Sequence, residues 1–316
     1  MLIDPRHLQI LTAIVDAGGL TEGAARLGKS QPSLSRSLAL LEARIGAPLF
    51  EKGKRPLQPT ALGRALAVEG RVIASASEAA GRTALSHSKG QAGILRVAGS
   101  PVFMDGVISQ TIASFQAEFP DLRVDQSYGY LDALLNELSL DQIDIAICPV
   151  TTDQVPEGFS FRKLLPGRNV IACSSAHPLA RKKSLILDDI APYPWIAPPA
   201  DSPLHADLRR VLDEIGISDI KVSFSGGSLT SILNVLEGSQ AITILPHSVV
   251  FMQRHTKKLH PLSIRIKHPA RDLGLLTRNG QQATPAVRRL EKHLIAQFSG
   301  LSHSIAQHER NALWRS

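Results

Sequence analysis

The chain has 316 residues, a length that predicts about two domains. Apolar residues make up 43% and charged residues 20%, which is a globular composition and excludes a disordered chain. The first residues lack the basic and apolar regions of a signal peptide, and no stretch has the roughly 18 uncharged apolar residues that span a bilayer. We therefore expect a cytoplasmic protein without a membrane partner.

The positive charge is unevenly distributed. The formal net charge is +7, and residues 1–90 hold 12 of the 35 basic side chains but only 7 of the 28 acidic ones. Five of the seven excess charges therefore lie in the first 90 residues. A basic module of this kind is compatible with a polyanionic partner such as nucleic acid.

Three short helices are predicted at the start of the chain. Asp4 followed by proline is a helix start, and Gly18-Gly19 ends that helix. A second helix is expected from near Thr21, whose hydroxyl can cap it, to Gly28. Ser30 is expected to cap a third helix, which has an apolar face of Leu34, Leu38, Leu41 and Ile45.

The rest of the third helix is small, hydroxylic and basic. This helix and the one before it, joined by Gly28-Lys29, form the pattern of a helix-turn-helix that enters the major groove of DNA. Glutamine pairs with adenine, serine bonds a base edge or a phosphate, and arginine contacts the backbone. A helical hairpin with a solvated polar face explains the same pattern. The candidate DNA-binding residues here are Thr21, Ser30, Gln31, Pro32, Ser33, Ser35 and Arg36.

A basic turn and a long helix follow. Residues 50–59 predict a two-stranded wing whose tip holds Lys52, Lys54 and Arg55, positioned to contact phosphates or a narrow minor groove. Thr60 is expected to cap an alanine-rich helix that runs to about Leu85. A long helix with a thin apolar stripe needs a partner helix, which predicts dimerisation. The stripe comprises Leu62, Leu66, Ile73, Ala76 and Ala80.

Strands and helices alternate after residue 93, which indicates parallel sheets in two similar lobes. The chain is expected to cross between the lobes near residues 165–168 and 264–268, forming a hinge. Strands are expected at 94–98, 122–125, 143–147, 169–174, 221–224, 241–245 and 271–276, and helices at 101–118, 131–138, 204–214, 230–236 and 285–298.

A small-molecule site is expected beyond the carboxyl ends of the strands, between the lobes. Ser100 is its first candidate, because it lies at a strand end and at a helix N-terminus that favours an anion. Each hydroxyl in the set can equally be a helix cap. The candidates are Ser100, Pro101, Val102, Tyr128, Pro149, Ser202, Ser228 and Thr230.

Other classes of protein have weaker support. The sequence lacks the nucleophile elbow, phosphate loop, zinc-protease and dinucleotide motifs, so no enzymatic activity is expected. A free solute-binding protein would have no use for residues 1–60. Cys148 and Cys173 are expected to be buried apolar side chains, with redox sensing as the alternative. The histidines show no metal-ligand spacing, and no cofactor is expected.

Ordered sequence blocks resemble the LysR-type transcriptional regulators. They are Gly19 to Leu27, Ser30 to Arg36, Leu41-Glu42, Gly46 to Glu51, Thr60-x-x-Gly63, His177 to Ala180 and Ile244 to Pro246. The resemblance implies an N-terminal winged helix-turn-helix (1–60), a linker helix (61–90) and a two-lobed effector domain like the periplasmic binding proteins (91–300). Lobe 1 would comprise about 93–165 and 268–300, lobe 2 about 166–267, and residues 301–316 would form a flexible tail.

The resemblance also implies a mechanism. Gln31, Pro32, Ser35, Arg36 and Arg55 would contact promoter DNA, and a homodimer would form through the linker helices and a homotetramer through the effector domains. An unidentified small molecule would close the lobes, change the DNA bend and so alter access of RNA polymerase. Two positions depart from the family pattern, because Asp141 and Ala241 stand where glycine is usual.

Overall fold

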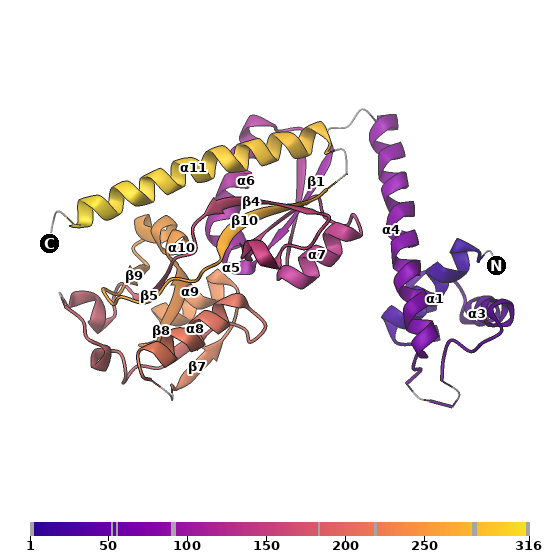
Figure 1. The fold of residues 1–316 in the computed structure, drawn as a ribbon, viewed down its shortest axis with the longest axis horizontal. Coiled ribbons are helices and arrows are strands. Elements are labelled where there is room, and N and C mark those ends of the chain that lie inside the picture. The colour runs from indigo at the N-terminus through magenta and orange to yellow at the C-terminus, as the bar shows by residue number, and fades with distance from the viewer. Residues whose placement is uncertain are drawn as a thin grey trace. The chain divides into compact units, whose positions relative to one another are not determined.

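The structure is a computed structural model that describes residues 3–51, 53–54, 56–89, 93–182, 184–217, 220–279 and 283–313. The chain divides into two compact units, one built mainly from residues 1–91 and the other mainly from residues 92–316. Figure 1 shows the elements of each unit, which are taken separately below.

The first unit begins with three helices, α1 (Pro5–Ala17), α2 (Leu20–Arg26) and α3 (Gln31–Ile45). The predicted start of α1 is confirmed, because the Asp4 carboxylate accepts a hydrogen bond from the Arg6 N–H at 2.9 Å. Its predicted end is also confirmed, since Gly18 adopts the left-handed conformation at φ 74°. The three helices enclose one apolar core to which Leu11, Ile14, Leu34 and Leu41 contribute fully buried side chains.

Two predicted caps are wrong. Gly19 occupies the cap position of α2, so Thr21 lies inside the helix and its hydroxyl does not cap it. Ser30 does occupy the cap position of α3, but its side chain makes no capping hydrogen bond. The hydroxyls of both residues are therefore free of a capping role at the helix starts.

The predicted two-stranded wing is reduced to its base. Phe50 and Pro59 form an isolated antiparallel bridge, and the Glu51 N–H donates to the Gln58 carbonyl at 2.9 Å. Lys54 is exposed in the turn beyond this base. Lys52 and Arg55, the other predicted residues of the tip, lie outside the described residues.

The long helix α4 (Ala61–Lys89) packs against α1. Thr60 caps it as predicted, because its hydroxyl accepts a hydrogen bond from the Gly63 N–H at 3.0 Å. The Thr12 hydroxyl donates to the Ala67 carbonyl at 2.9 Å, and Arg71 pairs with Asp16. The side of α4 that faces α1 is thus centred on Ala67, and Leu62 of the predicted stripe is exposed together with Val68 and Val72.

The second unit contains two five-stranded mixed sheets, which confirms the two predicted lobes. Lobe 1 has the strand order β2-β1-β3-β10-β4 and lobe 2 the order β7-β6-β8-β5-β9. In lobe 1, β10 is antiparallel to β3 and β4, and in lobe 2, β5 is antiparallel to β8 and β9. Each of these two strands is the first that the chain forms after it crosses from the other lobe. The strands are β1 (Ile94–Gly99), β2 (Arg123–Tyr128), β3 (Ile145–Val150), β4 (Phe159–Leu165), β5 (Asn169–Ser174), β6 (Trp195–Ala197), β7 (Val222–Ser225), β8 (Ile242–Pro246), β9 (Leu259–Pro261) and β10 (Asp272–Arg278).

Helices cover both faces of the sheets. In lobe 1, α6 and α11 lie on one face and α7 on the other, and in lobe 2, α8 lies on the face opposite α9 and α10. The helices are α5 (Pro101–Phe103), α6 (Ser109–Glu118), α7 (Leu131–Ser139), α8 (Pro203–Glu214), α9 (Leu229–Glu237), α10 (His247–Met252) and α11 (Pro285–Leu313). Short 3-10 turns span 152–154, 178–181, 187–189 and 253–255.

Several predicted elements differ from the structure. The strands β4, β6 and β9 were not predicted, and the predicted helix 101–118 is interrupted by a π-helical segment, η1 (Met104–Ile108). The expectation of a flexible tail from residue 301 is wrong as far as Leu313, because α11 continues to that residue. Ile305 is buried, and the His308 ring contacts Phe251 of lobe 2 with ring centroids 5.5 Å apart. Asp141, which stands where glycine is usual in the family pattern, adopts the left-handed conformation at φ 53°.

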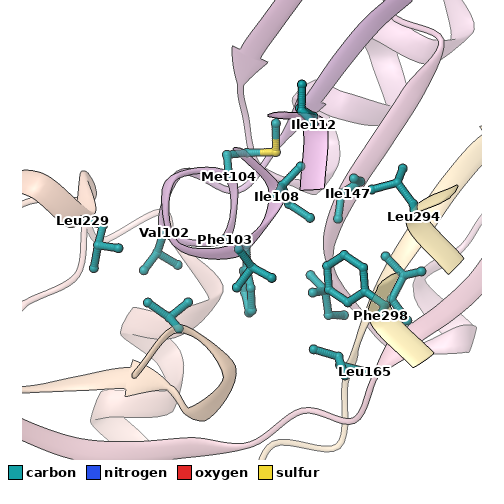
Figure 2. Close-up of a cluster of buried hydrophobic side chains, with 14 of the residues drawn as sticks. Val102, Phe103, Met104, Ile108, Ile112, Ile147, Leu165, Leu229, Leu294 and Phe298 are labelled. Carbon is teal, nitrogen blue, oxygen red and sulfur yellow. The ribbon is translucent and has the colours of Figure 1, made fainter. Parts of the chain in front are cut away.

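One apolar core runs from lobe 1 into lobe 2. It joins Val102, Phe103 and Phe298 of lobe 1 to Leu229 and Val249 of lobe 2. Figure 2 shows side chains of this cluster, with Leu229 near Val102. The lobes are therefore packed against each other through buried apolar side chains, and opening them would expose this surface to water.

None of the helices in the described ranges combines the length and the apolar content that crossing a bilayer requires.

Candidate DNA-binding and effector sites

The candidate DNA-binding surface is the side of α3 that faces solvent. Leu34, Leu38 and Leu41 are buried against α1, which fixes the orientation of the helix. The polar candidates lie on the remaining surface, so the predicted separation of an apolar and a polar face is observed. Thr21, Ser30, Gln31, Pro32, Ser33, Ser35 and Arg36 are all exposed.

The exposed surface of α3 has the groups that DNA contacts require. The Gln31 amide can both donate and accept, as adenine does in the major groove, and the Arg36 guanidinium provides a fixed positive charge. Leu40, which follows Arg36 by one helical turn, is 61% exposed. This apolar side chain was not predicted as part of the surface, and its position off the spacing of Leu34, Leu38 and Leu41 was the signal available in the sequence.

The candidate effector site is a pocket between lobe 1 and lobe 2. Its empty volume is about 700 Å³, counting the solvent at its mouth. Five of the eight predicted effector residues line it: Ser100, Pro101, Val102, Pro149 and Ser202. The other three, Tyr128, Ser228 and Thr230, are exposed and do not line it.

Ser100 has a polar group that the protein does not use. It is 4% exposed, and its hydroxyl is buried without a hydrogen-bond partner in the described structure. Its backbone N–H is bonded to the Ile147 carbonyl at 3.1 Å, and the next residue is proline, which has no N–H. Neither residue therefore offers an anion the free backbone N–H that was predicted, and the Ser100 hydroxyl is the polar group that a ligand can satisfy.

Ser202 and Tyr130 also line the pocket. The Ser202 hydroxyl accepts a hydrogen bond from the His205 N–H at 3.3 Å, so it caps α8, which is the alternative that the sequence left open. Burial is the main factor that raises the pKa of Tyr130, with a contribution from Asp201, so its hydroxyl stays protonated and can donate. Tyr130 was not among the predicted effector residues, although it lines the pocket.

Proline side chains form much of the remaining wall. The proline ring fixes φ at each of these positions, which restricts the backbone of the wall. The wall is thus largely apolar, which favours a ligand with an apolar body. The prolines are Pro101, Pro149, Pro166, Pro198, Pro199, Pro203, Pro246 and Pro269.

A buried charged network borders the pocket near the crossovers between the lobes. The Asp207 side chain, 5% exposed, pairs with Arg271 and accepts a hydrogen bond from the Asn169 amide at 2.7 Å. Arg210 approaches the same carboxylate at 3.3 Å, and Arg271 also donates to the Pro203 carbonyl at 2.6 Å. The network ties α8 and β5 to the segment that returns the chain to lobe 1.

The sequence reasoning missed this network. Asn169, Asp207 and Arg271 all line the pocket. Asn169 and Arg271 lie next to the two predicted crossovers, and that position was the available signal. The crossovers also approach each other closely, because a Cβ on Gly167 would lie 1.9 Å from the Arg271 carbonyl oxygen. Only glycine fits at this contact.

Both cysteines have the surroundings of buried apolar side chains. Cys148 and Cys173 are buried, and burial raises the pKa of both thiols to about 12. Their thiolate forms are therefore absent at neutral pH, which disfavours redox chemistry. Within the described ranges, no three His, Cys, Asp or Glu side chains gather as a metal site would need.

Two family models match the chain. The model described as "Bacterial regulatory helix-turn-helix protein, lysR family" matches residues 5–64, which contain α1, α2 and α3. The model described as "LysR substrate binding domain" matches residues 88–299, which contain both lobes. The second match covers more than half of the chain.

Curated relatives agree with these models. The chain is 24% identical to the uncharacterized HTH-type transcriptional regulator YnfL of Escherichia coli strain K12, over 93% of this chain and 99% of that protein. It is 33% identical to the transcriptional activator protein LysR of the same strain, over 59% of this chain and 60% of that protein.

A solved structure shows the same fold. The crystal structure of CbnR, described as a LysR family transcriptional regulator, matches with a TM-score of 0.66 at 19% identity, over 92% of this chain and 98% of that one. A second structure contains full-length CbnR with its target DNA and gives the same TM-score. The chain belongs to the LysR family of DNA-binding transcriptional regulators, with a helix-turn-helix followed by an effector-binding domain.

Proposed function

We propose that α3 is the recognition helix and that its exposed residues contact promoter DNA. Gln31 contacts a base edge, Arg36 a phosphate, and Ser33 and Ser35 either group, with Thr21, Ser30, Pro32 and Lys54 at the border of the contact. Lys52 and Arg55 belong to the same proposal on sequence grounds. The observation that supports it most is the exposure of all these α3 residues on a helix whose leucine face is buried.

We further propose that the regulator acts as a homodimer through α4 and as a homotetramer through its effector domains. The apolar side chains Leu62, Val68 and Val72 are exposed on the part of α4 that α1 does not cover. A second copy of the helix would remove them from water. Two recognition helices per dimer would then bind an interrupted inverted repeat in the cytoplasm, where RNA polymerase has access to the same promoter.

The effector that fits the pocket is a small molecule with an apolar body and a hydrogen-bond acceptor. The proline wall packs on the body, and the Ser100 and Tyr130 hydroxyls donate to the acceptor. Because the lobes already share a buried core, we expect the effector to shift their packing rather than to close an open cleft. That shift changes the arrangement of the oligomer and the bend of the bound DNA.

The experiment that tests this function combines ligand screening with DNA binding. Small metabolites are screened by thermal shift on the full chain, and each hit is added to a gel shift with promoter-proximal DNA. We expect a hit to raise Tm and to change the DNA complex, and Ser100→Ala to weaken the hit about fivefold, the loss of one neutral hydrogen bond. A hit whose affinity is unchanged in Ser100→Ala would remove Ser100 from the site.

A further inference from the structure

Asp105 joins the two lobes of the second unit through its carboxylate. Asp105 lies in the π-helical segment η1 of lobe 1 and is half-buried. One of its carboxylate oxygens accepts a hydrogen bond from the Tyr128 hydroxyl at 2.8 Å. The other accepts from the Leu229 N–H at 3.2 Å, which belongs to the first residue of α9 in lobe 2. One carboxylate thus has partners in both lobes.

The position it occupies in lobe 2 is a helix N-terminus. The first N–H groups of a helix have no partner within the helix and attract negative charge. In α9, the residue before the helix is Ser228, but its side chain makes no capping hydrogen bond. The Leu229 N–H is satisfied by the carboxylate of Asp105 instead, so this carboxylate from lobe 1 takes the place of the cap in lobe 2.

The backbone next to Asp105 allows this close approach. A Cβ on Gly106 would lie 2.7 Å from Val249 Cγ1 and 3.2 Å from Leu229 Cδ2, so only glycine fits between η1 and lobe 2. The π-helical turn inserts one residue relative to an α-helix, which changes the direction of the side chains around it. Leu229 and Val249 also belong to the apolar core shared by the lobes, and Figure 2 shows Leu229 near Val102.

We propose that Asp105 is a specificity-determining residue that occupies the anion-binding N-terminus of α9 and excludes a ligand carboxylate from it. The bridge formed by Tyr128, Asp105 and Leu229 also fixes the distance between η1 and α9. The consequence for ligand choice rests on the proposed effector site. An effector is then bound through Ser100 and Tyr130, and Ser228 and Thr230 take no part, which agrees with their absence from the pocket lining. The hydrogen bond to Asp105 is also the main cause that raises the pKa of Tyr128.

The test removes the carboxylate and then supplies one from solution. Asp105→Ala is compared with Asp132→Ala, which removes an exposed carboxylate on α7 of the same unit. Amide hydrogen exchange is measured on the full chain without effector, with and without acetate. We expect the Leu229 amide to exchange about tenfold faster in Asp105→Ala, since a hydrogen bond to a charged group is lost. Acetate should slow this exchange again in Asp105→Ala alone, because it fills the vacated position.

Two results would overturn the proposal. One is an Asp105→Ala protein that folds and whose Leu229 amide exchanges as in Asp132→Ala. The other is an effect of acetate that is equal in Asp105→Ala and in the unaltered protein. Should Asp105→Ala fail to fold, Asp105→Asn retains the shape and an acceptor oxygen but not the charge. We expect intermediate exchange, and exchange equal to the unaltered protein would contradict the role given to the negative charge of Asp105 at the N-terminus of α9. These outcomes do not depend on any effector, whereas failure of the proposed effector site appears as ligand binding that Ser100→Ala leaves unchanged.

Discussion

The surface of α3 and the effector pocket differ in how much of each lies in one stretch of chain. The polar candidates on α3 fall within residues 30–36, and one buried leucine face orients all of them. The pocket takes side chains from positions as far apart as Ser100 and Arg271, in both lobes and at both crossovers. The periodicity of the sequence is therefore enough to predict the surface of α3. The residues of the effector pocket come together only through the topology of the second unit.

The charges of the two regions differ in the same way. On α3, the basic side chain Arg36 is exposed and available to a phosphate. At the pocket, Arg271 is paired with Asp207, and the side chains of the pair are 15% and 5% exposed. We propose that charge serves DNA binding in the first region, whereas in the second region the buried ion pair serves the packing of the lobes.

The largest expected effect comes from the buried pair. Asp207→Ala leaves Arg271 buried without its carboxylate, so we expect the effector domain to lose about 3 kcal/mol of unfolding free energy. Urea unfolding measures it. Asp213→Ala, which removes an exposed carboxylate from the same helix, is the control. Equal unfolding midpoints in the two variants would show that the pair does not hold the lobes.

A smaller effect is expected at Arg36. Arg36→Ala removes a phosphate contact, so binding should weaken about tenfold on all DNA sequences, and the dependence of log K on log salt should fall by about 1. Fluorescence anisotropy at several salt concentrations measures both. Arg44→Ala, an exposed arginine in the last turn of α3, serves as the control. A loss confined to one sequence would instead make Arg36 a base contact.

Gln31 should affect one base pair only. Gln31→Ala removes a paired donor and acceptor, and we expect a loss of about 1 to 2 kcal/mol of discrimination at one adenine position. Competition with duplexes substituted at single positions measures this, while binding to scrambled DNA should stay the same. Equal losses on specific and scrambled DNA would contradict the assigned contact.

The smallest effect is expected at the cysteines. Because burial raises the pKa of Cys148 and Cys173 to about 12, both thiols stay protonated until the pH approaches that value. Thiol reagents at neutral pH should leave both unmodified in the folded protein, as measured by mass spectrometry. DNA binding should also be insensitive to peroxide. A peroxide response that is lost in Cys148→Ala or Cys173→Ala would reverse this assignment.

Sequence alone predicted the elements whose signals are local. The proline after Asp4 and the left-handed Gly18 set the bounds of α1, and the leucine spacing set the buried face of α3. The three-residue strands β6 and β9 are too short for alternation to appear. The C-terminal part of α11 has only a few apolar residues, such as Leu301 and Ile305, and Ile305 lines a small pocket with residues remote in sequence, among them Leu165 and His247.

The sites follow the same division. Ser100 was predicted because a strand end followed by a proline at a helix start is a local signal in the sequence. The burial of its hydroxyl without a partner has no such local signal. Asp207 resembles any helical aspartate in the sequence, and only the return of Arg271 from the other crossover makes it part of a buried network. Ser228 was predicted as a ligand contact, and the competing carboxylate of Asp105 lies 123 residues earlier in the chain.

Sequence-selective binding of DNA is the central claim, and selection from genomic fragments tests it most directly. The purified full chain and the double variant Gln31→Ala, Arg36→Ala are each mixed with sheared DNA of the source genome, and the bound fragments are sequenced. We predict that the unaltered protein enriches fragments with an interrupted inverted repeat and that the double variant does not. Absence of any enriched sequence with the unaltered protein, or the same enrichment with both proteins, would contradict the role assigned to α3.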